Sequence, residues 1–257
     1  MRTNPLMGLL LAVAIGGHPM SGLAQKDNPA PVDPKAMAAL EAMGAYLRSL
    51  KSFEITATTA TDEVLDDGLK VQLDGTAKLT VRKPDRMRVT ISSDRKQREF
   101  YYDGKSVTLY GPRVKYYATV AAPPTVGETV QLLAQKYGID LPLADLFVWG
   151  SDKARPEDIK RAIYLGPATI AGTAADQYAF RQADVDWQVW IRTGPMPVPL
   201  KLVVTTTSEP THPEHISVLR WNTAPGINEK MFEFVPPKGA LKIAIQSTDG
   251  KVEPAGK

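Results

Sequence analysis

The chain of 257 residues carries a net charge of +3 at pH 7 and contains no cysteine. A balance this close to neutral gives no electrostatic reason to expect a nucleic-acid partner, and the absence of thiols excludes disulfides and thiolate metal sites. The length suits one large domain built mainly from β-strands, or two smaller ones, with a core that needs no covalent staples.

The first 24 residues have the layout of a secretory signal peptide. Arg2 supplies a weak positive start, residues 6–15 form a short apolar run, and residues 22–24 (GLA) resemble a cleavage site. The alternative is a buried N-terminal helix. No apolar run reaches the roughly 20 residues that span a bilayer, so we expect an exported protein that is not integral to a membrane. Residues 25–33 are polar and contain proline, which predicts a disordered linker.

Residues 34–50 are expected to form an amphipathic helix. Asp33 is suited to cap its N-terminus, and Pro34 suits its first turn. Apolar side chains then recur at helical spacing, at Met37, Leu40, Met43 (or Gly44) and Leu47. A single apolar stripe of this kind needs another surface to pack against.

From Ser52 the sequence alternates between apolar and polar residues with many β-branched side chains, which predicts strands. Six such runs follow one another up to Val120. Turn sequences separate them, among them DDG at 66–68, KPD at 83–85, DG at 103–104 and GP at 111–112. Short links between consecutive strands favour an antiparallel meander.

The middle of the chain predicts helices. Residues 127–138 place Val130, Leu133 and Tyr137 on one helical face and end with a glycine suited to a C-cap. Residues 141–150 indicate a short apolar helix or turn, and residues 155–164 a third helical piece. Strands are expected again at 177–181, 186–192, 200–206 and 216–222.

One face of the expected sheet is consistently apolar, and the other is mixed with occasional large aromatics. Because a long antiparallel sheet twists and curls, we predict an α+β fold that is mainly antiparallel β, a curled unclosed half-barrel of about 10–11 strands with helices as a lid. This single domain would span residues 34–246, with a flexible tail at 247–257. The lid would cover either a packed core, which composition alone favours, or a ligand cavity.

Groups that carry catalysis are scarce. His212 and His215 flank a proline in a polar stretch, which favours an exposed loop over a metal site. The carboxylate pairs at 66–67 and at 184 and 186 fit solvated turns better than acid–base work. No phosphate-binding glycine pattern and no Gly-x-Ser-x-Gly elbow is present. We therefore expect a protein that is not an enzyme and needs no metal or cofactor.

Four segments occur in an order that is typical of one group of proteins: AKLTVRKPDRMRV, FYYDGKSVTLYGPRVKYYATV, WIRTGPMPVPLKLVV and FEFVPPKGA. In this order they resemble the periplasmic lipoprotein carriers of the Lol system and their relatives. The ending MFEFVPPKGALKI and the overall length look most like the predicted periplasmic proteins of the domain of unknown function 2092 family. The resemblance covers essentially all of residues 35–245.

The resemblance implies a LolA-like fold, an unclosed antiparallel half-barrel whose helices form a lid over a hydrophobic cavity. In the carriers, an arginine directly before the proline helps to hold the lid closed. Lys83 stands at that position here, before Pro84, and is the candidate lid latch. Lysine lacks the planar fork of arginine, and strand alternation points the neighbouring Arg82 to the opposite face.

We therefore expect a soluble, monomeric periplasmic carrier, of the Gram-negative type, for an amphipathic lipid or an acylated protein. The candidate ligand-binding residues are Tyr102, Tyr110 and Tyr116 on the concave face and Leu133, Phe147 and Trp149 in the lid. The alternative is an interaction or sensor module that binds an envelope protein, such as a membrane-bound partner, through the rim or edge of the sheet. A third interpretation is an enzyme with an unrecognised carboxylate site.

Overall fold

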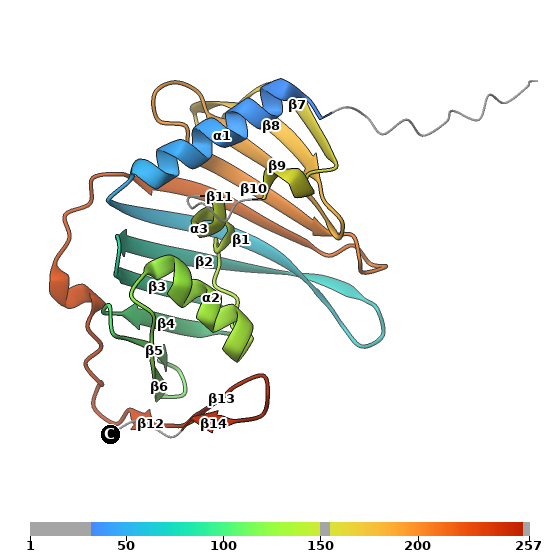
Figure 1. Ribbon diagram of the computed structural model, residues 1–257. Helices are drawn as coiled ribbons and strands as arrows, with labels where there is room; N and C mark the ends of the chain where they lie inside the picture. Colours follow the sequence, from blue (N-terminus) through green and yellow to red (C-terminus); the bar gives the residue numbers. More distant parts are fainter. Residues whose placement is uncertain (1–31, 150–154, 254–257) are drawn as a thin grey trace, which may run out of the picture. The chain divides into compact units, whose positions relative to one another are not determined.

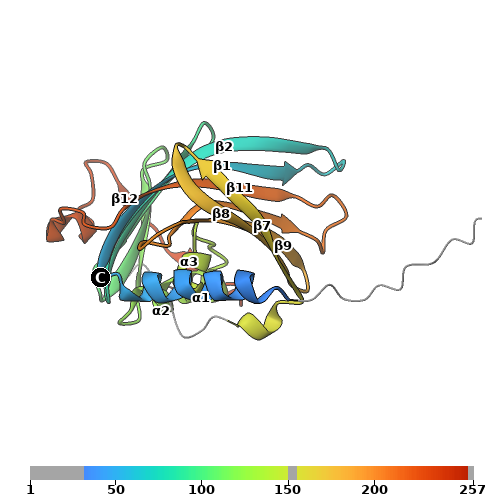
Figure 2. The same cartoon turned by 90° about the horizontal axis from the view of Figure 1, so that it is seen from above.

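A single curled sheet dominates the computed structural model, which describes residues 32–149 and 155–253 within a compact unit of residues 31–257. Its 12 strands lie in the order β12-β6-β5-β4-β3-β2-β1-β11-β10-β9-β8-β7 (Figure 1). All neighbours are antiparallel except β12 and β6. The two edge strands do not pair with each other in the described part of the chain, so the sheet is unclosed, as predicted. Figure 2 shows its curl.

Strands that are consecutive in the sequence are neighbours in the sheet, both in β1–β6 before the helical insert and in β7–β11 after it. They are β1 (Ser52–Val64), β2 (Lys70–Arg82), β3 (Arg86–Ser93), β4 (Gln97–Tyr102), β5 (Ser106–Gly111), β6 (Tyr116–Ala121), β7 (Arg161–Ile170), β8 (Thr173–Arg181), β9 (Val185–Arg192), β10 (Pro199–Thr206), β11 (Glu214–Asn222) and β12 (Leu241–Lys242). A separate hairpin joins β13 (Ile245–Gln246) to β14 (Val252–Glu253). The expected flexible tail from residue 247 therefore contains a strand.

The helices begin and end where local chemistry favours it. They are α1 (Pro34–Ser49), α2 (Val126–Tyr137) and α3 (Asp145–Trp149), with short 3₁₀ turns η1 (Pro156–Asp158) and η2 (Glu229–Phe232). The Asp33 side chain caps α1 by accepting a hydrogen bond from the Lys35 amide at 2.8 Å. Gly138 ends α2 in the left-handed conformation, which glycine adopts without steric cost.

The helix predicted at residues 155–164 is wrong. Only η1 is helical there, and β7 begins at Arg161 and pairs with β8 along its length. Val32 also forms a parallel bridge to Ala162, and the Asp33 amide donates to the Ala162 carbonyl at 3.1 Å. Sheet pairing therefore overrides a helical pattern that extends over too few residues to be decisive.

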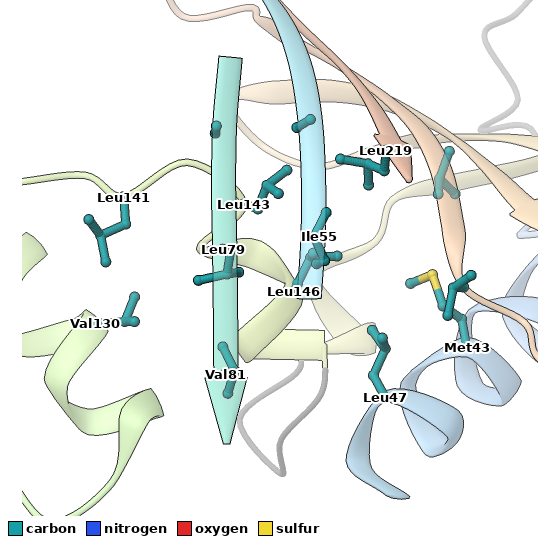
Figure 3. Close-up of a cluster of buried hydrophobic side chains, with 14 of the residues drawn as sticks. Met43, Leu47, Ile55, Leu79, Val81, Val130, Leu141, Leu143, Leu146 and Leu219 are labelled. Atoms are coloured by element: carbon teal, nitrogen blue, oxygen red, sulfur yellow. The ribbon is translucent and has the colours of Figure 1, made fainter. Parts of the chain in front are cut away.

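The core lies on the concave face of the sheet, under the helices (Figure 2). Register brings Ile55 of β1 between Leu79 of β2 and Trp221 of β11. Figure 3 shows Met43 and Leu47 of α1, Val130 of α2 and Leu146 of α3 in the same buried cluster. The predicted apolar face of the sheet is thus the face that the helices cover.

A segment near the C-terminus covers part of the other, convex face. The ring of Phe234 lies 5.0–5.4 Å from the rings of Tyr101, Tyr110 and Tyr117, and Phe232 is fully buried. Arg82 pairs with Glu229 of η2 at 3.0 Å, which confirms that it points away from the helices. Three tyrosines on the second face therefore pack against this chain's own C-terminal segment.

Truncating Leu219, which is buried on the concave face, tests the position of the core. Leu219→Ala should lower the free energy of unfolding by about 2–5 kcal/mol, because it removes apolar contacts and leaves a cavity. Arg220→Ala, at the next and exposed position of β11, should change it by less than about 0.5 kcal/mol. Urea denaturation of both variants measures the difference, and equal effects would contradict the assignment of faces.

Candidate functional site

A cavity of about 560 Å³ lies between the helices and the concave face. It is bounded by the end of α1, the β2–β3 turn, the start of α2, α3 and two strand residues. The apolar lining includes Leu47, Phe53, Val126, Val130, Ala134, Ala144, Leu146, Phe147 and Trp221, and the polar lining includes Lys83, Thr125, Glu128, Gln131 and Asp145. The walls are mainly apolar, with polar groups contributed chiefly by the helices and the turn.

The β2–β3 turn connects both long helices to the sheet. The Lys83 ammonium donates to the Leu47 carbonyl in the last turn of α1 at 2.8 Å. One residue further on, the Pro84 carbonyl accepts from the amide of Val126, the first residue of α2, at 2.7 Å. Burial lowers the pKa of Lys83, and the nearby Arg48 adds to this shift. The contact of Lys83 with α1 fits the proposed latch, whose effect on the lid stays a prediction.

A close approach of backbones holds α3 against α1. A Cβ at Gly44 would lie 2.8 Å from the Trp149 carbonyl oxygen, a distance that only a glycine permits. From this position the α3 side chains diverge. Phe147 points to the main cavity and lies 6.5 Å from the ring of Phe53, while Trp149 lies 5.5 Å from Trp187 beside a second cavity of about 100 Å³.

Asp145 lines both cavities. The residue is exposed to solvent, yet the protein around it raises the pKa of the Asp145 carboxyl by desolvation, while the nearby His215 opposes the shift. Among the described residues no hydrogen bond or ion pair engages this carboxylate. Asp145 was not a sequence candidate, because nothing in its local pattern distinguishes it from a solvated aspartate.

His215 also differs from the sequence-based expectation. It lies in β11 opposite Thr61 of β1, on the concave face, and not in an exposed loop. Its Nδ1 lies 2.7 Å from the Thr61 hydroxyl and its Nε2 lies 2.9 Å from the Ser217 hydroxyl. Burial lowers the pKa of His215. No group of three or more side chains able to hold a metal ion occurs among residues 32–149 and 155–253.

The lid candidates have different surroundings. Phe147 lines the main cavity and Trp149 the smaller one. Leu133 of α2 is buried in the hydrophobic core and lines neither cavity. Sequence reasoning missed Phe53 and Trp221, whose ring centroids lie 5.6 Å apart. They belong to strands that are far apart in the sequence and that only the sheet pairing brings together.

The tyrosine candidates do not meet at one site. Tyr102 is fully buried on the concave face, where its hydroxyl donates to the Pro123 carbonyl. Tyr116 lies at the sheet edge beside Leu241 and is 44% exposed. The expected concave placement of Tyr110 is wrong, because the register pairs it with Glu99 and Tyr117 on the convex face. Burial also raises the pKa of Tyr101, on that convex face, to about 12.

Removing the Lys83 ammonium tests its hold on α1. Lys83→Met should leave the Leu47 carbonyl without its donor and weaken the end of α1 by about 1 kcal/mol, or roughly fivefold in local opening. Amide hydrogen exchange over residues 43–50 measures this. Lys78→Met, at an exposed ion pair with Glu54, is the control that should leave α1 unchanged. Equal protection of α1 in both variants would contradict a latch.

Asp145→Asn tests how the charge of this carboxylate, which lines both cavities, affects stability. A carboxyl with a raised folded-state pKa stabilises the protein below its unfolded pKa of 3.8, and that stability is lost as the pH rises through the folded value. Asp145→Asn should therefore raise stability at pH 7, and the gain should shrink as the pH falls towards 3.8. Thermal unfolding across this range checks the trend, with Asp74→Asn, at an exposed position of β2, as the control; a gain independent of pH would contradict it.

Comparison with solved structures finds loose likenesses. LprF from Mycobacterium bovis is 13% identical over 81% of this chain and 99% of its own, with a TM-score of 0.45. The lipoprotein LppX from Mycobacterium tuberculosis is 12% identical over 76% and 100%, with a TM-score of 0.48. A LolA superfamily protein from Nitrosomonas europaea is 10% identical over 77% and 97%, with a TM-score of 0.36. Since these scores lie below 0.5, the fold description depends on this chain's own strand pairing.

The comparison with protein families identifies the family of this chain, which the comparison with solved structures does not. No curated protein matches the chain. Across the described residues, none of the helices has the length and apolar character needed to cross a membrane. Residues 36–246, most of the chain, match a family described as predicted periplasmic protein. The signal peptide predicted at residues 1–24 lies outside the described residues. The family match shows that the chain belongs to the domain of unknown function 2092 family and that its location is the periplasm.

Proposed function

We propose that this protein binds the apolar chain of an amphipathic lipid, or the acyl group of an acylated protein, in the main cavity. The observation that carries the proposal is the mainly apolar cavity under the lid helices. Its volume of about 560 Å³ falls within the range of ordinary small-ligand pockets. The proposal also agrees with the carrier role that the sequence resemblance implies.

Burial of the chain would supply the binding energy. Each methylene removed from water contributes about 0.8 kcal/mol, less the cost of ordering the ligand and the lid. Phe53, Phe147 and Trp221 provide the broad apolar surfaces of this cavity. Because their side chains come from both the sheet and α3, movement of α3 would open or close the wall that the ligand contacts.

The polar lining favours an amphipathic ligand over a purely apolar one. Glu128 accepts a hydrogen bond from the Thr125 hydroxyl at 2.7 Å, and Lys83 is engaged by the end of α1. Asp145 has no such partner in the described part of the chain. A donor group on the ligand would find an acceptor in this carboxylate, which lines the cavity.

Strand addition at a free sheet edge, on which the interaction-module alternative relies, has less support. At one edge, β12 pairs with the first residues of β6. At the other, Val32 bridges to Ala162 near the start of β7, and the register between β7 and β8 shifts at Tyr164 to Gly166. Covered or irregular edges discourage pairing with another chain.

Filling the cavity tests the proposal. Ala134 lines the cavity, and the neighbouring Gln135 is exposed on α2. Ala134→Trp should exclude the ligand, whereas Gln135→Trp adds the same side chain outside the cavity. Native mass spectrometry and lipid extraction, applied to each protein purified from its own periplasm, measure the bound lipid.

We expect near-stoichiometric lipid in the unchanged protein and in Gln135→Trp, and a loss of at least about tenfold in Ala134→Trp. Circular dichroism checks that both variants are folded. Lipid retained by folded Ala134→Trp would place the ligand elsewhere, and an unchanged protein free of lipid would contradict the proposal.

A further inference from the structure

Two segments far apart in the sequence form one corner of the sheet. The turn between β5 and β6 lies beside β12, whose Leu241 amide donates to the Lys115 carbonyl at 2.8 Å. The Ile243 amide then donates to the Tyr117 carbonyl at 2.9 Å. These bonds align Leu241 with Tyr116 in parallel register (Figure 1).

This corner exposes large apolar side chains. Val114 is 63% exposed, Tyr116 44%, Leu241 59% and Ile243 43%. We call these four residues the corner strip. Single exposed apolar side chains are ordinary on protein surfaces, but here four occur on two hydrogen-bonded segments, and clustered exposed apolar side chains are typical of binding surfaces.

The charged side chains on the two segments of the strip are all positive. Arg113, Lys115, Lys238 and Lys242 are exposed on the same two segments, while residues 105–127 and 234–248 contain no Asp or Glu. The Arg113 guanidinium also donates to the Ser93 carbonyl at 3.0 Å. That contact brings in the β3–β4 turn, which adds the exposed Arg95 and Lys96 and the acidic Asp94.

We propose that the corner strip docks the protein on a membrane surface that contains anionic lipids. Exposed apolar side chains between cations match the chemistry of an interface, where they insert at the headgroup boundary and the cations meet lipid phosphates. The strip is too small for a standard protein interface of about 20–30 residues a side, whereas surface insertion needs only a few. The proposal does not depend on what the cavity binds.

Vesicle binding tests the docking. The exported protein should sediment with phosphatidylcholine vesicles that contain phosphatidylglycerol and much less with pure phosphatidylcholine, and added salt should weaken the binding. Leu241→Ser combined with Ile243→Ser should reduce partitioning at least about tenfold. Lys115→Asn combined with Lys238→Gln should reduce it about fivefold per charge.

Leu69→Ser is the matched control, because Leu69 is 57% exposed but lies in the β1–β2 turn beside two aspartates. It should leave binding unchanged. Equal binding to both kinds of vesicle, or undiminished binding by a folded corner-strip variant, would overturn the proposal. Self-association that the same variant abolishes, without vesicle binding, would instead assign the strip to a protein interface.

Discussion

The rest of the structure depends on one constraint, that an unclosed curled sheet cannot fill its own concave side. A closed small barrel packs its interior with side chains from facing strands, but here the strands form an open arc with an apolar inner face. Helices must cover that face. The turn at Lys83 and Pro84 makes this possible, because it bonds the end of α1 and the start of α2 to the same point of the sheet.

The two faces of the sheet are covered in different ways, and the difference determines where binding is expected. On the convex face, Phe234 packs into three tyrosine rings. On the concave face, helices cover a curved surface, and α3 approaches α1 closely at Gly44, where a Cβ would collide with the Trp149 carbonyl oxygen. Incomplete packing there leaves the cavity and places Asp145 at its boundary. The proposed ligand would fill space that the lid helices do not.

Local patterns predicted much of this arrangement, and non-local register accounts for the rest. The helices α1 and α2 could be expected, because caps, spacing and turn residues lie close together in the chain. A role for Lys83 at the lid was expected only from the family resemblance, since its partner Leu47 is 36 residues away. Tyr110 was misplaced because the hairpin pairs Tyr102 with Val107, which puts Tyr110 an odd number of residues away and on the other face. Phe53 and Trp221, and likewise Thr61 and His215, meet only through the pairing of β1 with β11, which no short motif announces.

Contact between a ligand chain and Trp221 is the most direct test of the central claim. Bromine atoms quench indole fluorescence at short range, and Trp221 lines the main cavity, whereas Trp190 lies on the convex face under the Lys201 ammonium. A brominated fatty acid should quench the fluorescence of the unchanged protein and of Trp190→Phe, and Trp221→Phe should remove much of that quenching. Equal quenching in the two variants, or none in the unchanged protein, would contradict binding in the cavity.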